Sequence, residues 1–403
     1  MTAERSRREA GSALAEVFRN EAGRITASLI KRFGDFNIAE ESTQDAVVAA
    51  LEAWPEQGVP NNPGAWLLKV AYRRALNRLD RDKRLEAKIS RLHSEPTTTS
   101  GDDRLLLILM CCHPAIARES QVCLTLRAVC GFTTAEIARA FLTSEATVAQ
   151  RIVRAKRRVA SAGIPFRMPN ETELGERLGE VLAVLYLLFN EGHLSTSGDV
   201  ASQRPLSEEA AWLTDLLLGF LSEEPEIMGL LALMKLHLAR GSSRFNERGE
   251  IVLLGDQDRS SWDHRLVGQA VALIERAAAL RRVGPYQLEA AIAACHMEAP
   301  SADETDWPQI LVLYDMLLAF DPSAVVRLNR AIALSRVQGP AAGLKELDEI
   351  AAELDGYYLL HAARGYFLTE IGREEQARAA QLRALELTSN IAERALIQAR
   401  LRI

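Results

Sequence analysis

The stretch Phe132-Thr-Thr-Ala-Glu-Ile-Ala-Arg-Ala-Phe-Leu-Thr-Ser-Glu-Ala-Thr-Val-Ala-Gln-Arg-Ile-Val-Arg-Ala-Lys-Arg-Arg158 determines how the surrounding region folds. Thr133 can cap a short helix whose third residue is Glu136, which is the spacing of a capping box. A tight turn follows, and Ser144 caps a second helix. That second helix has an apolar stripe at helical spacing, formed by Val148, Ile152, Ala155 and Val159. The pattern predicts a helix-turn-helix whose second helix enters the major groove of DNA.

The residues outside the apolar stripe are the predicted DNA contacts of this second helix. Those in its N-terminal half would meet base edges, and the basic residues behind them would hold phosphates. A surface helix with a solvated basic face is the alternative, but the two caps and the lack of any acidic residue from Arg151 to Arg167 favour DNA. The predicted set is Ser144, Glu145, Thr147, Gln150, Arg151, Arg154, Arg157 and Arg158.

A second basic helix is predicted to begin just after Pro63, behind a loop rich in Pro, Gly and Asn. Its predicted buried side is Leu68, Ala71, Ala75 and Leu79. Cationic side chains that follow a backbone, next to aromatic rings that stack on bases, suit separated DNA strands. Trp66 and Tyr72 could equally belong to the core. The predicted contacts are Asn62, Trp66, Lys69, Tyr72, Arg73, Arg74, Asn77, Arg78 and Arg81.

An amphipathic helix with an acidic, polar edge is predicted upstream, over residues 39–51. By itself such an edge is most simply a solvated face. It gains a candidate role from the two helices that follow it. The edge consists of Glu40, Glu41, Gln44 and Asp45.

The composition predicts an all-α protein of more than one domain. Ala, Leu, Arg and Glu dominate the 403 residues, and alternating runs of β-branched residues are almost absent. The net charge of −6 divides unevenly, because residues 1–168 carry +7 and the remainder carries −13. A basic front part suits a polyanion and an acidic rear part does not, so DNA binding is expected before residue 169.

The chain divides into five predicted segments. Helical domains are expected at 10–90 and 104–164, joined by a flexible linker at 91–103, and a helical extension is expected at 170–284. Within it, Arg248 to Asp256 reads as a small strand or an extended loop. Helical repeats are expected at 285–403, because Asn329–Leu334 and Ala363–Leu368 align at an offset of 34 residues. Small residues at helix crossings with this period are similar to tetratricopeptide (TPR) repeats.

Other sequence features indicate which functions are not expected. The five cysteines lack the spacing of a zinc site or a disulfide framework, so small buried thiols are expected and no metal or cofactor. No apolar run reaches membrane-spanning length and no leader segment is visible, so a cytoplasmic protein without a membrane partner is predicted. Asp256, Asp258, Arg259 and His264 raise the alternative of an enzyme, but no catalytic motif accompanies them.

In this order, the three front segments resemble the conserved regions of extracytoplasmic-function (ECF) sigma factors of the sigma-70 family. The resemblance implies that Ala39 to Leu51 docks on core RNA polymerase, that Asn62 to Arg84 melts and reads the downstream promoter element, and that His113 to Val159 reads the upstream element. A subgroup with a long TPR-like extension has counterparts of Leu187–His193, Leu254–Arg259 and Trp307–Ile310. Its groove would take a protein partner.

One other reading explains part of the chain. A helix-turn-helix transcriptional regulator with a TPR domain that senses a ligand or a protein would account for residues 113–160 and for the repeats. It leaves the acidic edge and the basic aromatic helix of residues 39–84 without a role. Both readings give a non-catalytic protein that binds promoter DNA. Only the sigma-factor reading adds core polymerase as a partner.

Overall fold

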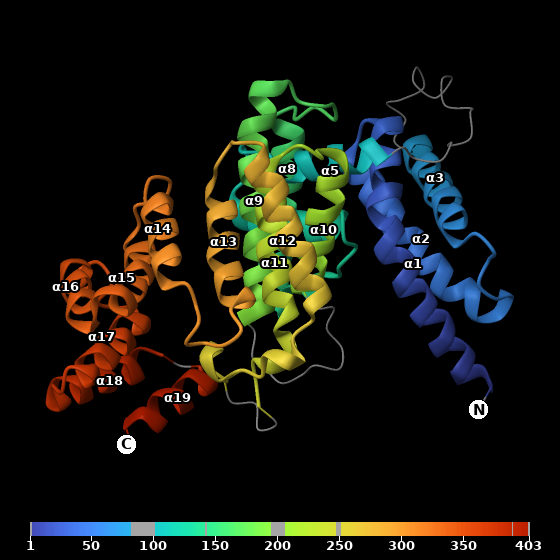
Figure 1. Cartoon of the computed structure of the whole chain (residues 1–403). Helices are drawn as coiled ribbons and strands as arrows, with labels where there is room; N and C mark the ends of the chain where they lie inside the picture. Colours follow the sequence, from blue (N-terminus) through green and yellow to red (C-terminus); the bar gives the residue numbers. More distant parts are fainter. Residues whose placement is uncertain are drawn as a thin grey trace. The chain divides into compact units, whose positions relative to one another are not determined.

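The structure is a computed structural model that describes residues 2–81, 101–141, 143–194, 206–246, 251–388 and 390–401 (Figure 1). The described residues are predominantly helical, which confirms the predicted all-α fold. Their one piece of extended pairing is an isolated antiparallel bridge between Phe245 and Ile251. The chain divides into two compact units, Met1–Leu213 and Thr214–Ile403.

Three helices open the first unit: α1 (Thr2–Phe33), α2 (Phe36–Gln57) and α3 (Pro63–Arg81). Each packs against the other two. Asp35 caps α2 by accepting the Ile38 N–H, and Gly58 ends it with a φ of 81°, a conformation that glycine adopts without strain. Helix α3 begins at Pro63 itself, where the prediction had the helix begin just after this residue.

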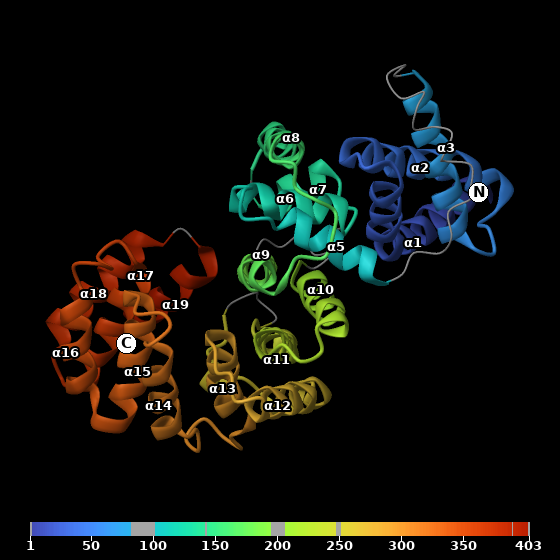
Figure 2. The same cartoon turned by 90° about the horizontal axis from the view of Figure 1, so that it is seen from above.

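Four shorter helices follow in the first unit: α5 (Gly101–Cys111), α6 (Arg118–Ala128), α7 (Thr134–Ala140) and α8 (Glu145–Ser161), visible together in Figure 2. Because α5 begins at Gly101, the last three residues of the predicted linker are helical, and the rest of it lies outside the described residues. Four of the five cysteines (Cys111, Cys112, Cys123 and Cys130) are buried around these helices as free thiols, as predicted. Burial raises the pKa of the Cys112 thiol to about 12, so this group stays protonated.

The extension begins within the first unit. Helix α9 (Glu171–Leu194) packs against α5 and α6, and Arg118 holds Glu180 of α9 at 3.0 Å. Helix α10 (Leu206–Phe220) starts in the same unit, where the Arg104 guanidinium lies 5.3 Å from the centre of the Trp212 ring. The helix-turn-helix region therefore shares a core with the start of the acidic rear part.

The second unit begins within α10, at Thr214. Its next helix, α11 (Pro225–Ala239), packs against both α12 (His264–Ala279) and α13 (Pro285–Glu298). Between α11 and α12 lie three single 3-10 turns: η1 (Gly241–Ser243), η2 (Leu254–Asp256) and η3 (Arg259–Ser261). The stretch predicted as a small strand or loop thus contributes one bridge residue and a 3-10 turn, while its first three residues lie outside the described part.

Helices in pairs complete the second unit: α14 (Trp307–Leu317), α15 (Ala324–Gln338), α16 (Pro340–Ile350), α17 (Tyr358–Glu370), α18 (Glu374–Leu387) and α19 (Ile391–Leu401). Helix α17 starts 34 residues after α15, and α18 starts 34 residues after α16. Small residues lie where the paired helices cross. A Cβ on Gly343 of α16 would come within 2.8 Å of the Ala331 carbonyl oxygen, and one on Gly365 of α17 within 2.5 Å of Gln381.

Candidate functional site

Helix α8 is held at both its start and its apolar side. The Ser144 hydroxyl accepts the Thr147 N–H at 3.1 Å, and the predicted stripe from Val148 to Val159 is buried. The preceding helix has the predicted capping box, with the Thr133 hydroxyl and the Glu136 carboxylate each accepting a backbone N–H of the other residue. Helices α7 and α8 therefore form the predicted helix-turn-helix, with a fixed recognition helix.

The structure separates the predicted DNA contacts of α8 into two sets. Gln150, Arg154 and Arg157 are exposed, and Arg154 reaches back to the Gln150 side chain at 3.4 Å. Arg151 is half-buried and pairs with Glu119 at 2.6 Å, while Arg158 donates to the Ala115 carbonyl. The remaining members lie on the first turn: Ser144 and Glu145 are exposed and Thr147 is half-buried. The first set is free to meet DNA without breaking a contact inside the protein.

Helix α3 also exposes a basic face. Asn62 caps it by accepting the Ala65 N–H at 3.0 Å. The buried side contains Leu67, not the predicted Leu68, because Leu67 continues the spacing set by Ala71, Ala75 and Leu79. Four of the predicted contacts are exposed: Lys69, Arg73, Arg74 and Asn77. The Arg81 side chain lies outside the described part.

The two aromatic residues of α3 lie at the boundary between core and surface. The half-buried Trp66 ring meets buried Trp54 edge-on, with centroids 5.7 Å apart. The Tyr72 ring packs against Phe33 in a tilted arrangement, with centroids 5.4 Å apart. Each ring touches the core and keeps some exposed surface, so its position is compatible both with a core role and with stacking on a DNA base. Each ring is also positioned by the core, which an aromatic that stacks on a base requires.

The acidic edge of α2 is divided between burial and exposure. Arg78 of α3 binds Glu41 at 2.6 Å and Asp45 at 2.8 Å, and its hydrogen bond with Asp45 raises the pKa of the Arg78 guanidinium. Gln44 is half-buried. Two predicted docking residues, Glu41 and Asp45, are thus paired with one predicted DNA contact, Arg78, in this structure.

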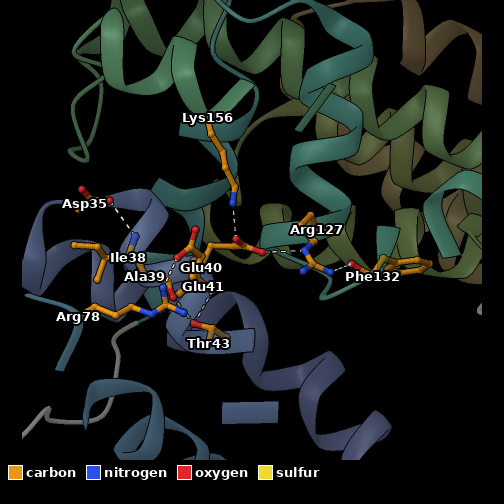
Figure 3. Close-up of polar contacts among 11 residues, drawn as sticks. Asp35, Ile38, Ala39, Glu40, Glu41, Thr43, Arg78, Arg127, Phe132 and Lys156 are labelled. Carbon is orange, nitrogen blue, oxygen red and sulfur yellow. Dashed lines mark hydrogen bonds and ion pairs between the residues drawn. The ribbon is translucent and has the colours of Figure 1, made fainter. Parts of the chain in front are cut away.

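Glu40 is buried, with only 4% of its side chain exposed. Its carboxylate accepts from Arg127 Nε at 2.8 Å and from Lys156 Nζ at 2.6 Å, as Figure 3 shows. Arg127 ends α6 and Lys156 lies on α8, so the contacts join α2 to the helix-turn-helix region. The sequence pattern predicted Glu40 on a solvated edge, so this part of the prediction is wrong. A signal existed, since Glu40 lies within the buried stripe that contains Phe36, Ala39 and Thr43.

The face of α2 that remains exposed also contains apolar side chains, which were not predicted. Val48 and Leu51 each leave 54% of their surface exposed, and Glu52 beside them is exposed too. They follow Glu41 and Gln44 along one side of the helix at intervals of three and four residues. An exposed apolar patch with a polar rim is a feature of protein-binding faces.

Comparison with known proteins agrees with this geometry. Residues 17–85 match the family described as sigma-70 region 2, and residues 106–159 match the family described as sigma-70, region 4. The chain belongs to the sigma-70 family. Region 2 thus contains α2 and α3, and region 4 contains the helix-turn-helix. Sigma-70 factors direct promoter-specific transcription by binding core RNA polymerase and promoter DNA, and they are initiation factors, not enzymes.

The rest of this sigma factor also has relatives. Residues 177–278 match a family of unknown function, DUF6596. A protein of Rhizobium meliloti (strain 1021), described as uncharacterized, is 41% identical over 387 residues, which span 93% of this chain and 92% of that protein. No solved structure matches the chain. Among the described helices of the sigma factor, none has the length and apolar character needed to cross a membrane.

Two of the residues that raised the enzyme alternative, Asp258 and Arg259, have structural roles in this sigma factor. Asp258 caps η3 by accepting the Ser260 N–H, and Arg259 donates to the carbonyl oxygens of His296 and Ala299. His264 is exposed at the start of α12. Within the described ranges, no group of His, Cys, Asp and Glu side chains is arranged to hold a metal ion.

Proposed function

We propose that the chain is an ECF-type sigma factor in which α2 docks on core polymerase, α3 opens and reads the downstream promoter element, and α8 reads the upstream element. One observation supports this most directly. Both DNA-facing helices bury an apolar stripe and expose a basic face, with Arg73 and Arg74 on α3 and Arg154 and Arg157 on α8. A regulator with a single helix-turn-helix needs only the second of these faces.

The docking face we propose on α2 combines the predicted Glu41, Gln44 and Asp45 with the exposed Val48 and Leu51. The acidic side chains would orient the polymerase and speed its association with α2. Val48 and Leu51 would stabilise the complex, because the partner removes their apolar surface from water. Glu40 is not part of this face, because its carboxylate is buried against Arg127 and Lys156.

The deciding experiment is transcription in vitro from a promoter library with purified core polymerase and no other sigma factor, followed by sequencing of the transcript starts. A sigma factor gives specific starts with core polymerase alone. A helix-turn-helix regulator gives none, because it acts on a polymerase that already carries a sigma factor. Absence of any specific start would therefore favour the regulator.

For the extension we propose a TPR-like domain that regulates the sigma factor through a protein partner. The 34-residue spacing of its helix pairs supports the repeat. A row of rings and guanidinium groups supports the partner site: exposed Arg336 lies 5.5 Å from the Trp307 ring centre and 5.7 Å from that of Tyr366, and Arg400 lies 5.9 Å from Tyr366. In the described part neither arginine forms an ion pair.

Such a row would favour an acidic segment of the partner. Guanidinium groups bind carboxylates in two-point geometry, and a neighbouring ring holds the guanidinium flat against it. A chain ended after Phe166 tests the regulatory role, since a change in specific transcription in either direction is expected. Because α9 packs against α5 and α6 in the full chain, circular dichroism must first show that the shortened chain is folded. Unchanged transcription by a folded, shortened chain would contradict regulation in cis.

A further inference from the structure

The segment between α11 and α12, drawn in yellow in Figure 1, gathers positive charge at one place in the second unit. Arg240 directly follows α11, and Arg259 lies in η3. His296 lies in the last turn of α13, where its carbonyl oxygen accepts from Arg259 Nη1 at 2.7 Å. We propose that these three residues form a binding site for a phosphoryl group, either free phosphate or the phosphate of a small phosphorylated molecule. The proposal goes beyond the sigma-factor role and does not depend on it.

The two guanidinium groups of this site differ from others in the same unit in their partners. Arg327 and Arg330 each form an ion pair with a carboxylate. Among the described residues, Arg240 donates to His237 Nδ1 at 3.1 Å, and Arg259 donates to carbonyl oxygens; neither pairs with a carboxylate. The rear part of the chain carries a net charge of −13, so carboxylates are plentiful there. Two arginines without one, side by side, therefore indicate a site for an anion.

The backbone balances only part of this positive charge. The ends of α11 and α13 each carry about half a negative charge, because their last carbonyl groups have no partner within the helix. Together they supply about one negative charge against two guanidinium charges. Burial, followed by repulsion from Arg244, lowers the pKa of Arg240 to about 10, and burial lowers the pKa of Arg259. Both groups stay charged at pH 7, so a bound anion would relieve the cost of burying them.

His296 adds a hydrogen-bond donor to the site. Its ring meets Trp307 edge-on, with centroids 5.1 Å apart, and neither ring nitrogen forms a hydrogen bond in the described part. Burial, followed by repulsion from Arg240 and Arg259, lowers the pKa of His296 to about 4, so near pH 7 the neutral ring carries one N–H. The nitrogens of Arg240 and His296 that lack a partner reach solvent. A ligand can therefore meet donors from both side chains.

Hydrogen bonds within the segment hold the site in place. The Asp263 N–H donates to the Ala239 carbonyl oxygen at 2.9 Å, which joins the two ends of the segment. Inside it, the Ser243 hydroxyl donates to the Arg240 carbonyl oxygen at 3.0 Å and accepts from Trp262 Nε1 at 2.9 Å. The backbone that carries the first arginine is thus fixed before a ligand arrives, as precise binding requires.

A phosphoryl group suits these donors better than a carboxylate does. It has three acceptor oxygens and a charge of about −1.5 to −2 near pH 7, whereas a carboxylate has two oxygens and a single charge. Guanidinium groups also match the geometry of phosphate, binding two of its oxygens at once. Arg240 and His296 can donate to different oxygens. Arg259, whose guanidinium lies 4.7 Å from the centre of the Trp262 ring, adds a fixed positive charge beside them.

The test is differential scanning calorimetry of the full chain in a phosphate-free buffer, with and without inorganic phosphate at constant ionic strength. Phosphate at about a hundredfold excess over its Kd should raise the Tm of the second unit by about 5–10 °C. Arg240→Gln should weaken phosphate binding by about 10- to 100-fold, because a hydrogen bond between charged groups is lost. The matched control is Arg378→Gln, which should keep the full response because Arg378 is exposed on α18.

A second measurement separates this role from a purely structural one. Without phosphate, Arg240→Gln should unfold at the same or a higher temperature than the unmodified chain, because it removes a half-buried charge that has no acidic partner in the described part. An arginine that only stabilises the end of α11 would lower the Tm when replaced.

Phenyl phosphate distinguishes the two sources of the ligand. Tighter binding than inorganic phosphate supports a phosphorylated molecule, and weaker binding supports free phosphate. Three results would overturn the proposal: no rise in Tm with either compound, an equal rise with acetate, or an equal phosphate response in Arg240→Gln. A lower Tm of Arg240→Gln without phosphate would also contradict it. Calorimetry needs no polymerase, so the result is independent of whether the chain starts transcription.

Discussion

The close crossing of α15 and α16 leads us to predict how Gly343→Ala changes the stability of the second unit. A Cβ added there would meet the Ala331 carbonyl oxygen and the Ser335 Cβ at 2.8 Å, and the Phe367 ring at 2.9 Å. Gly268, in the interior of α12, is exposed and has nothing within 4 Å of the same added atom. Both glycines lie in the second unit, so the change to alanine is chemically identical in the two variants and only the surroundings differ.

Two opposing effects set the sign at Gly343. Replacing a helical glycine by alanine stabilises a helix by about 1 kcal/mol, and Gly268→Ala should show this gain alone. Overpacking a filled crossing costs about 1–3 kcal/mol, and a backbone oxygen cannot move aside as a flexible side chain can. Gly343→Ala should therefore be less stable than Gly268→Ala by about 1–3 kcal/mol, since the helix gain cancels in the comparison.

Differential scanning calorimetry of the full chain measures this difference in the transition that unfolds the second unit. For a unit of this size, 1 kcal/mol corresponds to about 2–4 °C in Tm. Gly268→Ala should raise the Tm by about this amount, and Gly343→Ala should lower it or leave it unchanged. If Gly343→Ala raises the Tm as much as Gly268→Ala, the helices do not cross as closely as described, and the small-residue interpretation of the repeat fails.

Three further predictions concern single side chains. Arg154→Ala should weaken promoter binding by about 1–3 kcal/mol with loss of a base preference, measured by titration against single-base promoter variants; equal weakening on every sequence would make it a phosphate contact instead. Arg336→Glu should change specific transcription when the partner is present. The control is Arg378→Glu, because Arg378 is an exposed residue of α18 with no aromatic ring in contact in the described part, and it should leave transcription unchanged. The same response in both variants would contradict the partner site. Burial, followed by repulsion from neighbouring arginines, lowers the pKa of His296 to about 4, so the unfolded chain binds the extra proton between about pH 6.5 and 4, and stability should fall as pH falls through this window. His296→Gln should flatten that slope in urea titrations, and an unchanged slope would assign it to other groups.

The sequence was sufficient for features that depend on neighbours within one or two helical turns. The capping box at Thr133, the cap at Ser144 and the stripe from Val148 to Val159 all appear as predicted, because caps and stripes are decided by residue type at short spacing. The 34-residue offset likewise predicted the spacing of α15 to α18. The buried residue of α3 was misplaced by one position, from Leu67 to Leu68, since both are leucines and the choice depends on how α1 and α2 pack against the helix.

Partners distant in the chain could not be derived in the same way. The exposure of Val48 and Leu51 follows from which side of α2 the rest of the unit covers, and a single sequence does not contain that information. The burial of Arg151 against Glu119 is a similar case, since a basic residue off the apolar stripe of α8 looks equally available for DNA whether or not α6 pairs with it.

Glu40 is the clearest example of a residue whose partners are distant in the chain. Glu40 lies in a stripe of buried alanine and threonine side chains, and removing one partner of a buried ion pair costs about 3–5 kcal/mol when the other stays buried. The position is tolerable only where Arg127 and Lys156 are present, or where water or another cationic partner replaces them. The charge at Glu40 therefore depends on two cations that lie 87 and 116 residues further along the chain, and only the fold brings them together.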